Sequence, residues 1–190
     1  MKVGVLALQG AFREHREALE SLGVAAVEVR TPEGLDGVDA LVMPGGESTT
    51  MHHLLTSSGL VGPLREAISD GLAVFGTCAG LILLAREVLD GRADQTPLGA
   101  IDLTARRNAY GRQRDSFEAD LRMSGLDGPD FPGVFIRAPA IERVGDAVVV
   151  LAEHNGRPVL AKEGRVWVSS FHPELAGDRR VHERFLEEIA

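Results

Sequence analysis

The sequence predicts an α/β protein with an open, mostly parallel β-sheet that carries helices on both faces. Strand-like and helix-like segments alternate through the first half of the chain, as in proteins built from βαβ units. The strand-like segments are apolar along nearly their whole length, which is typical of parallel strands buried on both faces. No repeat, low-complexity tract or linker interrupts the 190 residues, so we expect one domain over 1–190.

Strands and helices are expected to alternate through the first half of the chain, beginning with a strand. Short apolar runs beside turn signals predict strands, at 2–8, 25–29, 39–44 and 72–75. Apolar residues at helical spacing predict helices, at 11–23, 49–59, 63–71 and 79–89. Gly23 stands where the first of these helices would end.

The second half of the chain changes character. Short strand-like runs are separated by Gly, Pro, Asn or Asp, at 99–105, 115–123, 133–139, 147–154, 157–164 and 165–171. A closing helix is expected at 178–190, with Asp178 as its N-cap.

Composition and charge exclude several classes of function. Hydrophobic residues make up 44% of the chain and charged residues 25%, the balance of an ordinary soluble globular protein. The formal net charge of -8 argues against wholesale binding to nucleic acid or to an acidic membrane. No apolar run approaches the roughly 20 residues that span a bilayer, and the first residues are typical of a strand rather than a signal peptide. A single cysteine cannot form an internal disulfide, which indicates a reducing cytoplasm.

The only cysteine lies in the segment Gly76-Thr77-Cys78-Ala79-Gly80, between an expected strand and an expected helix. This Gly-x-Cys-x-Gly pattern is the thiol version of a nucleophile elbow, a turn so tight that the side chain at its apex points out above the sheet. Bulky residues two places before or after the apex would collide with neighbouring backbone, so both positions favour glycine. A lone cysteine is more often a small buried hydrophobe, but a helix N-terminus favours a thiolate, and this context indicates a nucleophile.

A thiolate nucleophile needs a base and a group that orients the base. His172 and Glu174 follow the apolar run 165–171, and residues two apart in an extended segment project to the same side. We therefore expect the Glu174 carboxylate to hold the His172 imidazole. The remaining histidines have no comparable partner arrangement and are interpreted as surface or satisfied core residues: His15, His52, His53, His154 and His182. No spacing in the sequence indicates a metal site.

Two consecutive glycines, Gly45 and Gly46, directly follow the expected strand at 39–44. Their backbone N–H groups are free to approach a ligand, which makes this turn a candidate oxyanion hole. A phosphate cradle is the competing interpretation, but the turn lacks the P-loop pattern and its lysine. A plain tight turn is the structural alternative.

Taken together, these motifs resemble those of class I, triad-type glutamine amidotransferases. Within that group the chain resembles the glutaminase subunit of pyridoxal 5′-phosphate synthase, through GVLALQGAFREH, LVMPGGESTTM, FGTCAGLILLA, RRNAYGRQRDSFEADL, GVFIRAP, LAEHNGRPV and SSFHPEL. These stretches follow the order of that family and cover nearly the whole chain. The resemblance implies a flavodoxin-like fold and hydrolysis of L-glutamine to L-glutamate and ammonia, without a metal or an organic cofactor.

The resemblance also assigns roles to individual residues. It makes Cys78 the nucleophile, His172 the base and Glu174 the orienting partner. It places contacts to glutamine at Gly46, Glu47, Ser48, Arg107, Ile136 and Arg137. A carboxylate and a guanidinium suit the α-ammonium and α-carboxylate of free glutamine. Backbone donors for the oxyanion are expected from Gly45, Gly46 and Ala79, whereas Arg106 is interpreted as a surface charge.

The family's partner is a (β/α)8-barrel synthase subunit, to which ammonia passes through a protein channel. We expect the segment LQGAFREH to dock on that partner, and we expect docking to orient the Gly45–Gly46 peptide for catalysis. Two other classes remain open at this stage. One is a different elbow-cysteine α/β hydrolase, and the other is a binding module that has kept the fold without the chemistry.

Overall fold

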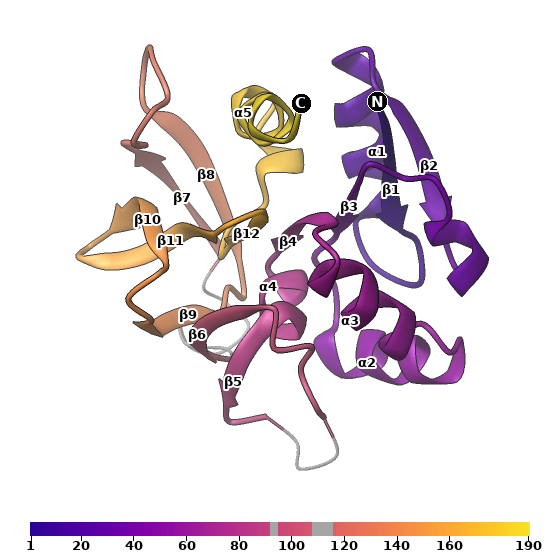
Figure 1. Cartoon of the computed structure of the whole chain (residues 1–190). Coiled ribbons are helices and arrows are strands. Elements are labelled where there is room, and N and C mark those ends of the chain that lie inside the picture. The colour runs from indigo at the N-terminus through magenta and orange to yellow at the C-terminus, as the bar shows by residue number, and fades with distance from the viewer. Residues whose placement is uncertain (92–94, 108–115) are drawn as a thin grey trace.

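A seven-stranded sheet forms the centre of the computed structural model, which describes residues 1–91, 95–107 and 116–190 (Figure 1). Its order is β10-β11-β12-β4-β3-β1-β2. The strands are β1 (Lys2–Leu6), β2 (Ala25–Val29), β3 (Ala40–Met43), β4 (Ala73–Thr77), β10 (Val149–His154), β11 (Arg157–Glu163) and β12 (Val166–Ser169). The pairs from β12 to β2 are all parallel, and β10 and β11 add an antiparallel edge. The predicted mostly parallel α/β sheet is therefore confirmed.

Helices cover both faces of this sheet, as predicted (Figure 1). Helices α1 (Phe12–Ser21) and α5 (Arg180–Ile189) lie on one face, where Leu19 and Phe185 join a core cluster. Helices α2 (Ser48–Ser57), α3 (Val61–Ser69) and α4 (Ala79–Leu84) lie on the other. Because apolar side chains of β1, β3 and β4 enter both clusters, the strands are buried on both sides.

Smaller sheets pack beside the central one. Strands β5 (Ala85–Leu89), β6 (Ile101–Arg106) and β9 (Ala140–Val144) form a three-stranded sheet, and β7 (Ser116–Leu121) pairs with β8 (Phe131–Ile136). Short 3₁₀ helices complete the described elements: η1 (Pro32–Leu35) and η2 (Pro173–Leu175).

The helix expected over 79–89 is a wrong prediction in its second half. Helix α4 ends at Leu84, the backbone of Ala85 turns to an extended conformation, and β5 begins there. Strand β5 pairs with β6, and Glu87 accepts a hydrogen bond of 2.8 Å from the Thr104 hydroxyl. Pairing with a distant strand thus overrides the helical propensity of this segment.

The ends of two helices bear on the predicted caps. Gly23 follows α1 with φ of +76°, a conformation that suits glycine, so the predicted end is confirmed. The N-cap of α5 is Arg179, and Asp178 lies one residue before it. The prediction of Asp178 as N-cap is therefore wrong by one position, although its Oδ1 still accepts the Arg180 N–H at 3.0 Å.

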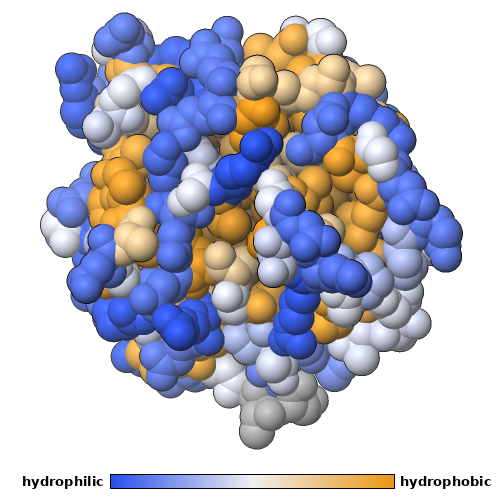
Figure 2. All heavy atoms as spheres, viewed as in Figure 1, coloured by the Kyte–Doolittle hydropathy of each residue, from blue (hydrophilic) through white to orange (hydrophobic). Residues whose placement is uncertain are grey.

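The face shown in Figure 2 mixes hydrophilic and apolar residues, with no large area of one kind. Large apolar side chains are exposed at Met1, Val149 and Leu175 among the described residues. No helix within 1–91, 95–107 and 116–190 is long and apolar enough to cross a membrane.

Candidate active site

Cys78 occupies the apex of the turn between β4 and α4. Its backbone has φ of +49°, a strained conformation for a residue with a side chain. The flanking glycines are there for the reason expected from sequence. A Cβ on Gly76 would lie 2.7 Å from the Gly80 carbonyl carbon, and a Cβ on Gly80 would lie 2.1 Å from the Met43 carbonyl oxygen. The backbone therefore has no room for a side chain at either position.

His172 and Glu174 reach Cys78 because β12 and β4 are parallel neighbours. Their carboxyl ends lie at the same edge of the sheet, with His172 just after β12 and Glu174 in η2. His172 Nδ1 lies 2.7 Å from Glu174 Oε1. The Cys78 side chain lines the same pocket as this imidazole, and its interaction with the ring raises the pKa of His172. The three predicted catalytic side chains thus form one chain of contacts.

The charges of Cys78, His172 and Glu174 stabilise each other. Burial alone would lower the pKa of His172, but the hydrogen bonds and negative charges of Cys78 and Glu174 outweigh burial and raise that pKa to about 10. Burial would raise the pKa of Glu174, but His15 and His172 hold it well below its usual value. At neutral pH the imidazole is therefore protonated and the carboxylate ionised.

The Gly45–Gly46 turn packs against His172 and Cys78. A Cβ on Gly45 would lie 2.3 Å from His172 Cε1 and 3.3 Å from Cys78 Cβ, so only glycine fits. The Gly45 carbonyl accepts a hydrogen bond of 3.0 Å from the Ala11 N–H. Because N–H and C=O point in opposite directions across a trans peptide, the Gly46 N–H points away from Ala11. Ala79, the third expected oxyanion donor, is the first residue of α4 and directly follows the nucleophile.

Glu47 caps helix α2 in addition to facing the pocket. Its carboxylate accepts hydrogen bonds from the N–H groups of Thr49 at 3.2 Å and Thr50 at 2.7 Å, and from the Thr50 hydroxyl at 2.9 Å. Arg107 Nη2 donates to the same carboxylate at 3.3 Å. These four contacts match the lone-pair sites of a carboxylate, so binding of an ammonium group there requires one of them to be exchanged.

Ile136 and Arg137 lie at the end of β8, opposite the nucleophile. The Ile136 carbonyl oxygen lies 4.0 Å from Cys78 Sγ. Arg137 is exposed and has φ of +45°, another strained backbone conformation that turns the chain at the rim of the pocket. Arg106 pairs at the surface with Asp90 and Glu142, in agreement with its interpretation as a surface charge.

A pocket of about 360 Å³ brings the predicted substrate contacts together above Cys78 and His172. Its lining includes Gly45, Gly46, Glu47, Ser48, Arg107, Ile136 and Arg137. The sequence interpretation missed six further lining residues: Gln9, Gly10, Ala11, Glu14, Ile82 and Leu175. Gln9 Oε1 accepts the Glu47 N–H at 2.8 Å, and its place just after β1, at the same sheet edge, was the signal that could have identified it. Of the quoted segment RRNAYGRQRDSFEADL, residues 108–115 lie outside the described residues.

Two histidines that were interpreted as surface or satisfied core residues lie directly behind this site. His15 Nε2 lies 3.2 Å from Glu174 Oε2, and His15 Nδ1 lies 3.0 Å from His182 Nε2. Both rings are fully buried. Their burial agrees with the interpretation as satisfied core residues, but the prediction that they lack a comparable partner arrangement is wrong, because His15 faces the Glu174 carboxylate. Their partners come from distant segments, so spacing along the chain carries no sign of the contact.

Comparison with known proteins agrees with this geometry. The family model described as SNO glutamine amidotransferase family matches residues 5–190. A protein of Mycobacteroides abscessus named pyridoxal 5′-phosphate synthase subunit PdxT is 57% identical over 187 residues, which are 98% of this chain and 96% of that protein. A PdxT of Mycobacterium tuberculosis is 54% identical over 189 residues, 98% of this chain and 95% of that one.

The fold is likewise shared with solved structures. A crystal structure described as a glutamine amidotransferase superposes with a TM-score of 0.93 at 52% identity, covering 98% of both chains. A PurLQS structure from Thermotoga maritima has a TM-score of 0.72 at 17% identity, over 100% of this chain and 99% of that one, and shares the fold alone. With a family model spanning nearly its whole length and relatives of this similarity, the chain belongs to the SNO glutamine amidotransferase family.

Proposed function

We propose that this chain is the glutaminase subunit of a pyridoxal 5′-phosphate synthase, which hydrolyses L-glutamine to L-glutamate and supplies the ammonia to a synthase partner. The observation that carries the proposal is the contact chain from Cys78 through His172 to Glu174 at the floor of a pocket sized for a small molecule. Relatives named as subunits of this synthase match nearly the whole chain.

The first half of the reaction forms a thioester. The Cys78 thiolate attacks the side-chain amide carbon of glutamine, and the carbonyl oxygen takes up the negative charge. His172, protonated at neutral pH, donates its proton to the leaving nitrogen, and ammonia departs as the C–N bond breaks. The γ-glutamyl group is then bound to the Cys78 sulfur, and His172 is neutral.

The second half of the reaction releases glutamate. Neutral His172 takes a proton from water, and the resulting hydroxide attacks the thioester carbon. The C–S bond breaks and returns the Cys78 thiolate beside a protonated His172. In both halves the oxyanion is stabilised by backbone N–H groups, for which Gly46 and Ala79 are the candidates.

The rim of the pocket provides the contacts for the amino-acid end of the substrate. Arg107 and Arg137 are the cations that suit the α-carboxylate, while Gly46, Ser48 and Ile136 provide backbone or hydroxyl groups. Glu47 suits the α-ammonium if the substrate replaces one of its four present partners. Glu14, exposed at the rim, is a second carboxylate within the same lining.

Ammonia loses its nucleophilicity when it is protonated in bulk water, so the product must reach the partner through protein. The partner is a (β/α)8-barrel subunit that builds pyridoxal 5′-phosphate in the cytoplasm. The segment LQGAFREH is the proposed docking surface. Support comes from its contact with the oxyanion turn, since Gly10 packs on the Gly45 carbonyl and Ala11 donates to it.

This contact suggests how docking controls activity. A Gly-Gly peptide can take either of two orientations at little steric cost. Movement of the Gln9–Ala11 loop upon docking would break or keep the hydrogen bond from the Ala11 N–H to the Gly45 carbonyl. The state of this hydrogen bond would set the direction of the Gly46 N–H. Loss of one oxyanion donor costs roughly 100- to 1,000-fold in kcat in other enzymes, so activation of that order is expected.

The test is glutamate formation from glutamine by the purified chain, with and without the synthase subunit. We expect slow turnover by the chain alone and an increase of about 100-fold or more when the partner is added. If neither sample forms glutamate, the glutaminase assignment is contradicted. Full activity of the chain alone would leave that assignment intact and contradict the docking mechanism.

A further inference from the structure

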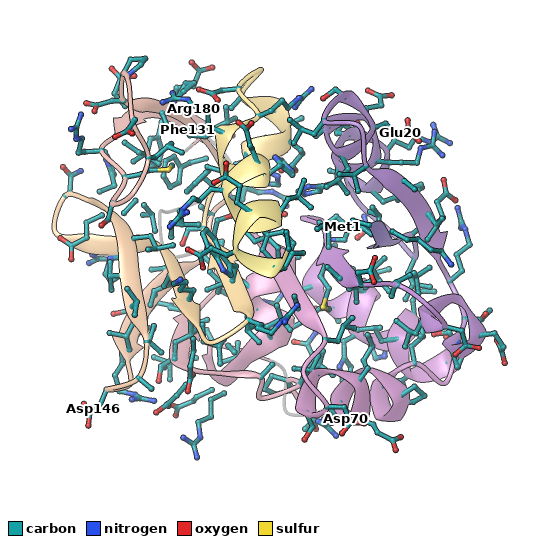
Figure 3. The ribbon with its side chains drawn as sticks, turned by 45° about the horizontal axis from the view of Figure 1, so that its top comes forward. Met1, Glu20, Asp70, Phe131, Asp146 and Arg180 are labelled. Carbon is teal, nitrogen blue, oxygen red and sulfur yellow. The ribbon has the colours of Figure 1, made fainter. Side chains whose placement is uncertain are left out.

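Behind Glu174 lies a buried pair of histidines that the reaction above does not use. His15 on α1 and His182 on α5 are fully buried, and His15 Nδ1 lies 3.0 Å from His182 Nε2. Helices α1 and α5 lie side by side on one face of the sheet in Figures 1 and 3. On its other side, His15 Nε2 lies 3.0 Å from Thr77 Oγ1 and 3.2 Å from Glu174 Oε2. The pair therefore extends the catalytic chain away from the pocket.

One arrangement of protons suits this pair. If His182 Nε2 donates to His15 Nδ1, then His15 carries its proton on Nε2, facing Thr77 and Glu174. His182 Nδ1 has no hydrogen-bond partner among the described residues and is then a bare lone pair. The reverse arrangement leaves a buried N–H on His182 without a partner and turns a lone pair of His15 toward the carboxylate. A doubly protonated His15 would also donate from Nδ1 to His182 Nε2, and it would leave the same buried N–H on His182 without a partner.

The charge state of His182 agrees with this arrangement. Burial, and the positive charges of His15 when protonated and of Arg179, lower the pKa of His182 to about 3, against the opposing effect of Glu174. His182 is therefore neutral at pH 7 and has a single N–H to donate. That N–H fixes which nitrogen of His15 carries the proton.

One of the two Glu174 oxygens depends on the N–H at His15 Nε2. Oε1 is engaged by His172 Nδ1 at 2.7 Å. Oε2 has no hydrogen bond of good geometry within the described residues, and His15 Nε2 at 3.2 Å is the positively polarised atom that faces it. The His15 N–H is directed chiefly at Thr77 Oγ1, so its attraction to Oε2 is electrostatic. A buried carboxylate oxygen without such a neighbour is costly.

From this geometry we infer that His15 is a positioning residue of the glutaminase reaction, whose Nε2–H, fixed by His182, holds Glu174 in the orientation that orients and charges His172. The inference rests on the proposed function. Without the His15 N–H, the Glu174 carboxylate would turn or take up a proton. His172 would then lose part of the charge that keeps its imidazole protonated.

The experiment compares two substitutions of similar size and polarity. In His15→Gln the side-chain amide reaches the position of Nε2 and keeps a donor for Thr77 and Glu174. In His15→Asn the amide reaches only the position of Nδ1, so the donor toward Glu174 is lost. Glutamate formation is measured in the complex with the synthase subunit, as a function of glutamine concentration and of pH.

We expect His15→Asn to lower kcat roughly 10- to 100-fold, the range known for residues that orient metal-binding histidines through a hydrogen bond, with KM for glutamine changed less than about twofold. The high-pH limb of the kcat profile should move to lower pH, because His172 loses its proton more easily. His15→Gln should restore most of the rate and the position of that limb. Equal kcat values and equal pH limbs for the two variants would overturn the inference.

Two controls distinguish a positioning role of His15 from a general loss of stability. Leu19→Ala removes a buried side chain from the same helix, and it should lower thermal stability without moving the pH limb. If His15→Asn does not fold, His182→Phe takes its place and should also move the limb to lower pH, because nothing then fixes the proton on His15 Nε2. An unmoved limb in His182→Phe would count against the inference. Wild-type complex that forms no glutamate would instead contradict the proposed function.

Discussion

At the scale of the residue, burial and charge act in opposite directions on the candidate catalytic side chains. His172 gains its high pKa from Cys78 and Glu174 in spite of burial. In the proposed mechanism the carboxylate therefore contributes mainly by orienting and charging the imidazole, whereas the imidazole itself transfers protons. Substitution of the two should have unequal effects.

Glu174→Gln is expected to reduce glutamine hydrolysis less than His172→Ala does. The amide retains the shape of the carboxylate but not its charge, and the loss is expected to reach at most about 10,000-fold, as for the acid of a serine triad. Both rates are measured in the complex with the synthase subunit. A silent Glu174→Gln would show that His172 is oriented by some other group and would reduce the triad to a dyad.

The rim residues should act on binding. Arg137→Ala and Glu47→Ala are expected to raise KM for glutamine more than they lower kcat, if they hold ground state and transition state alike. Glu47→Ala should in addition lower stability by about 1 kcal/mol, because its carboxylate caps α2. Steady-state kinetics together with urea unfolding separate the two effects. A loss of kcat alone would indicate a role in assembling the site.

The residue scale is also where prediction from sequence reached its limit. Cys78, His172 and Glu174 stand in local motifs whose geometry follows from a few neighbouring residues. His15 and His182 lie 167 positions apart, and only the packing of α1 against α5 brings them together. The contact between Arg107 and the Glu47 carboxylate was equally hidden, since it crosses 60 positions.

At the scale of the element, the elbow is a strand–turn–helix unit that works only if backbone can approach backbone. Gly80 lies against the Met43 carbonyl, and Gly76 lies against Gly80 itself. This close contact holds α4 against the ends of β3 and β4, and it keeps Cys78 in its strained conformation.

Gly80→Ala should therefore both destabilise the protein and disable the nucleophile. Its Cβ would lie 2.1 Å from the Met43 carbonyl oxygen, and overpacking of this kind costs about 1–3 kcal/mol. Gly62→Ala in α3 is the matched control, because a Cβ there meets nothing within 4 Å. The control should gain roughly 0.5–1 kcal/mol from reduced backbone entropy of the unfolded chain. Urea unfolding and glutamine turnover of both variants check this, and equal behaviour of the two would refute the packing argument.

The order of elements in the first half was predictable because parallel strands and amphipathic helices have distinct patterns. The segment 85–89 was not, because Arg86 and Glu87 favour a helix locally. Their contacts with Asp102 and Thr104 stabilise a strand instead. Pairing between distant segments is invisible to a local pattern, and β5 was missed for this reason. Strand β9 was missed as well, whereas its partner β6 was predicted, at 99–105.

At the scale of the whole molecule, the sheet places the pocket at one edge and the buried histidines on one face. The pocket opens at the carboxyl ends of its parallel strands, where loops from β1, β3, β4 and β12 meet. The buried histidines lie on the face covered by α1 and α5, which Figure 3 brings forward. A change in that packing therefore reaches both stability and the triad.

Acid should weaken the fold through His182. Its pKa is near 6.5 in the unfolded chain and about 3 in the folded one, so below pH 6.5 only the unfolded chain takes up this proton. The folded state then loses about 1.4 kcal/mol per pH unit from this residue. His182→Phe should therefore lose about 2 kcal/mol less than wild type between pH 6.5 and 5, a range in which Glu174 stays ionised. Urea unfolding at several pH values tests this, and parallel stability curves for the two proteins would contradict it.

The central claim is that Cys78 forms the thioester through which glutamine is hydrolysed. The most direct test is the rate of glutamate formation by wild type and by Cys78→Ser, each in complex with the synthase subunit and each checked for folding and binding to it. A serine hydroxyl is a far weaker nucleophile than a thiolate, so the rate should fall by roughly 1,000-fold or more while fold and binding are retained. A Cys78→Ser complex that keeps more than a few per cent of the wild-type rate would contradict the assignment of Cys78 as the nucleophile.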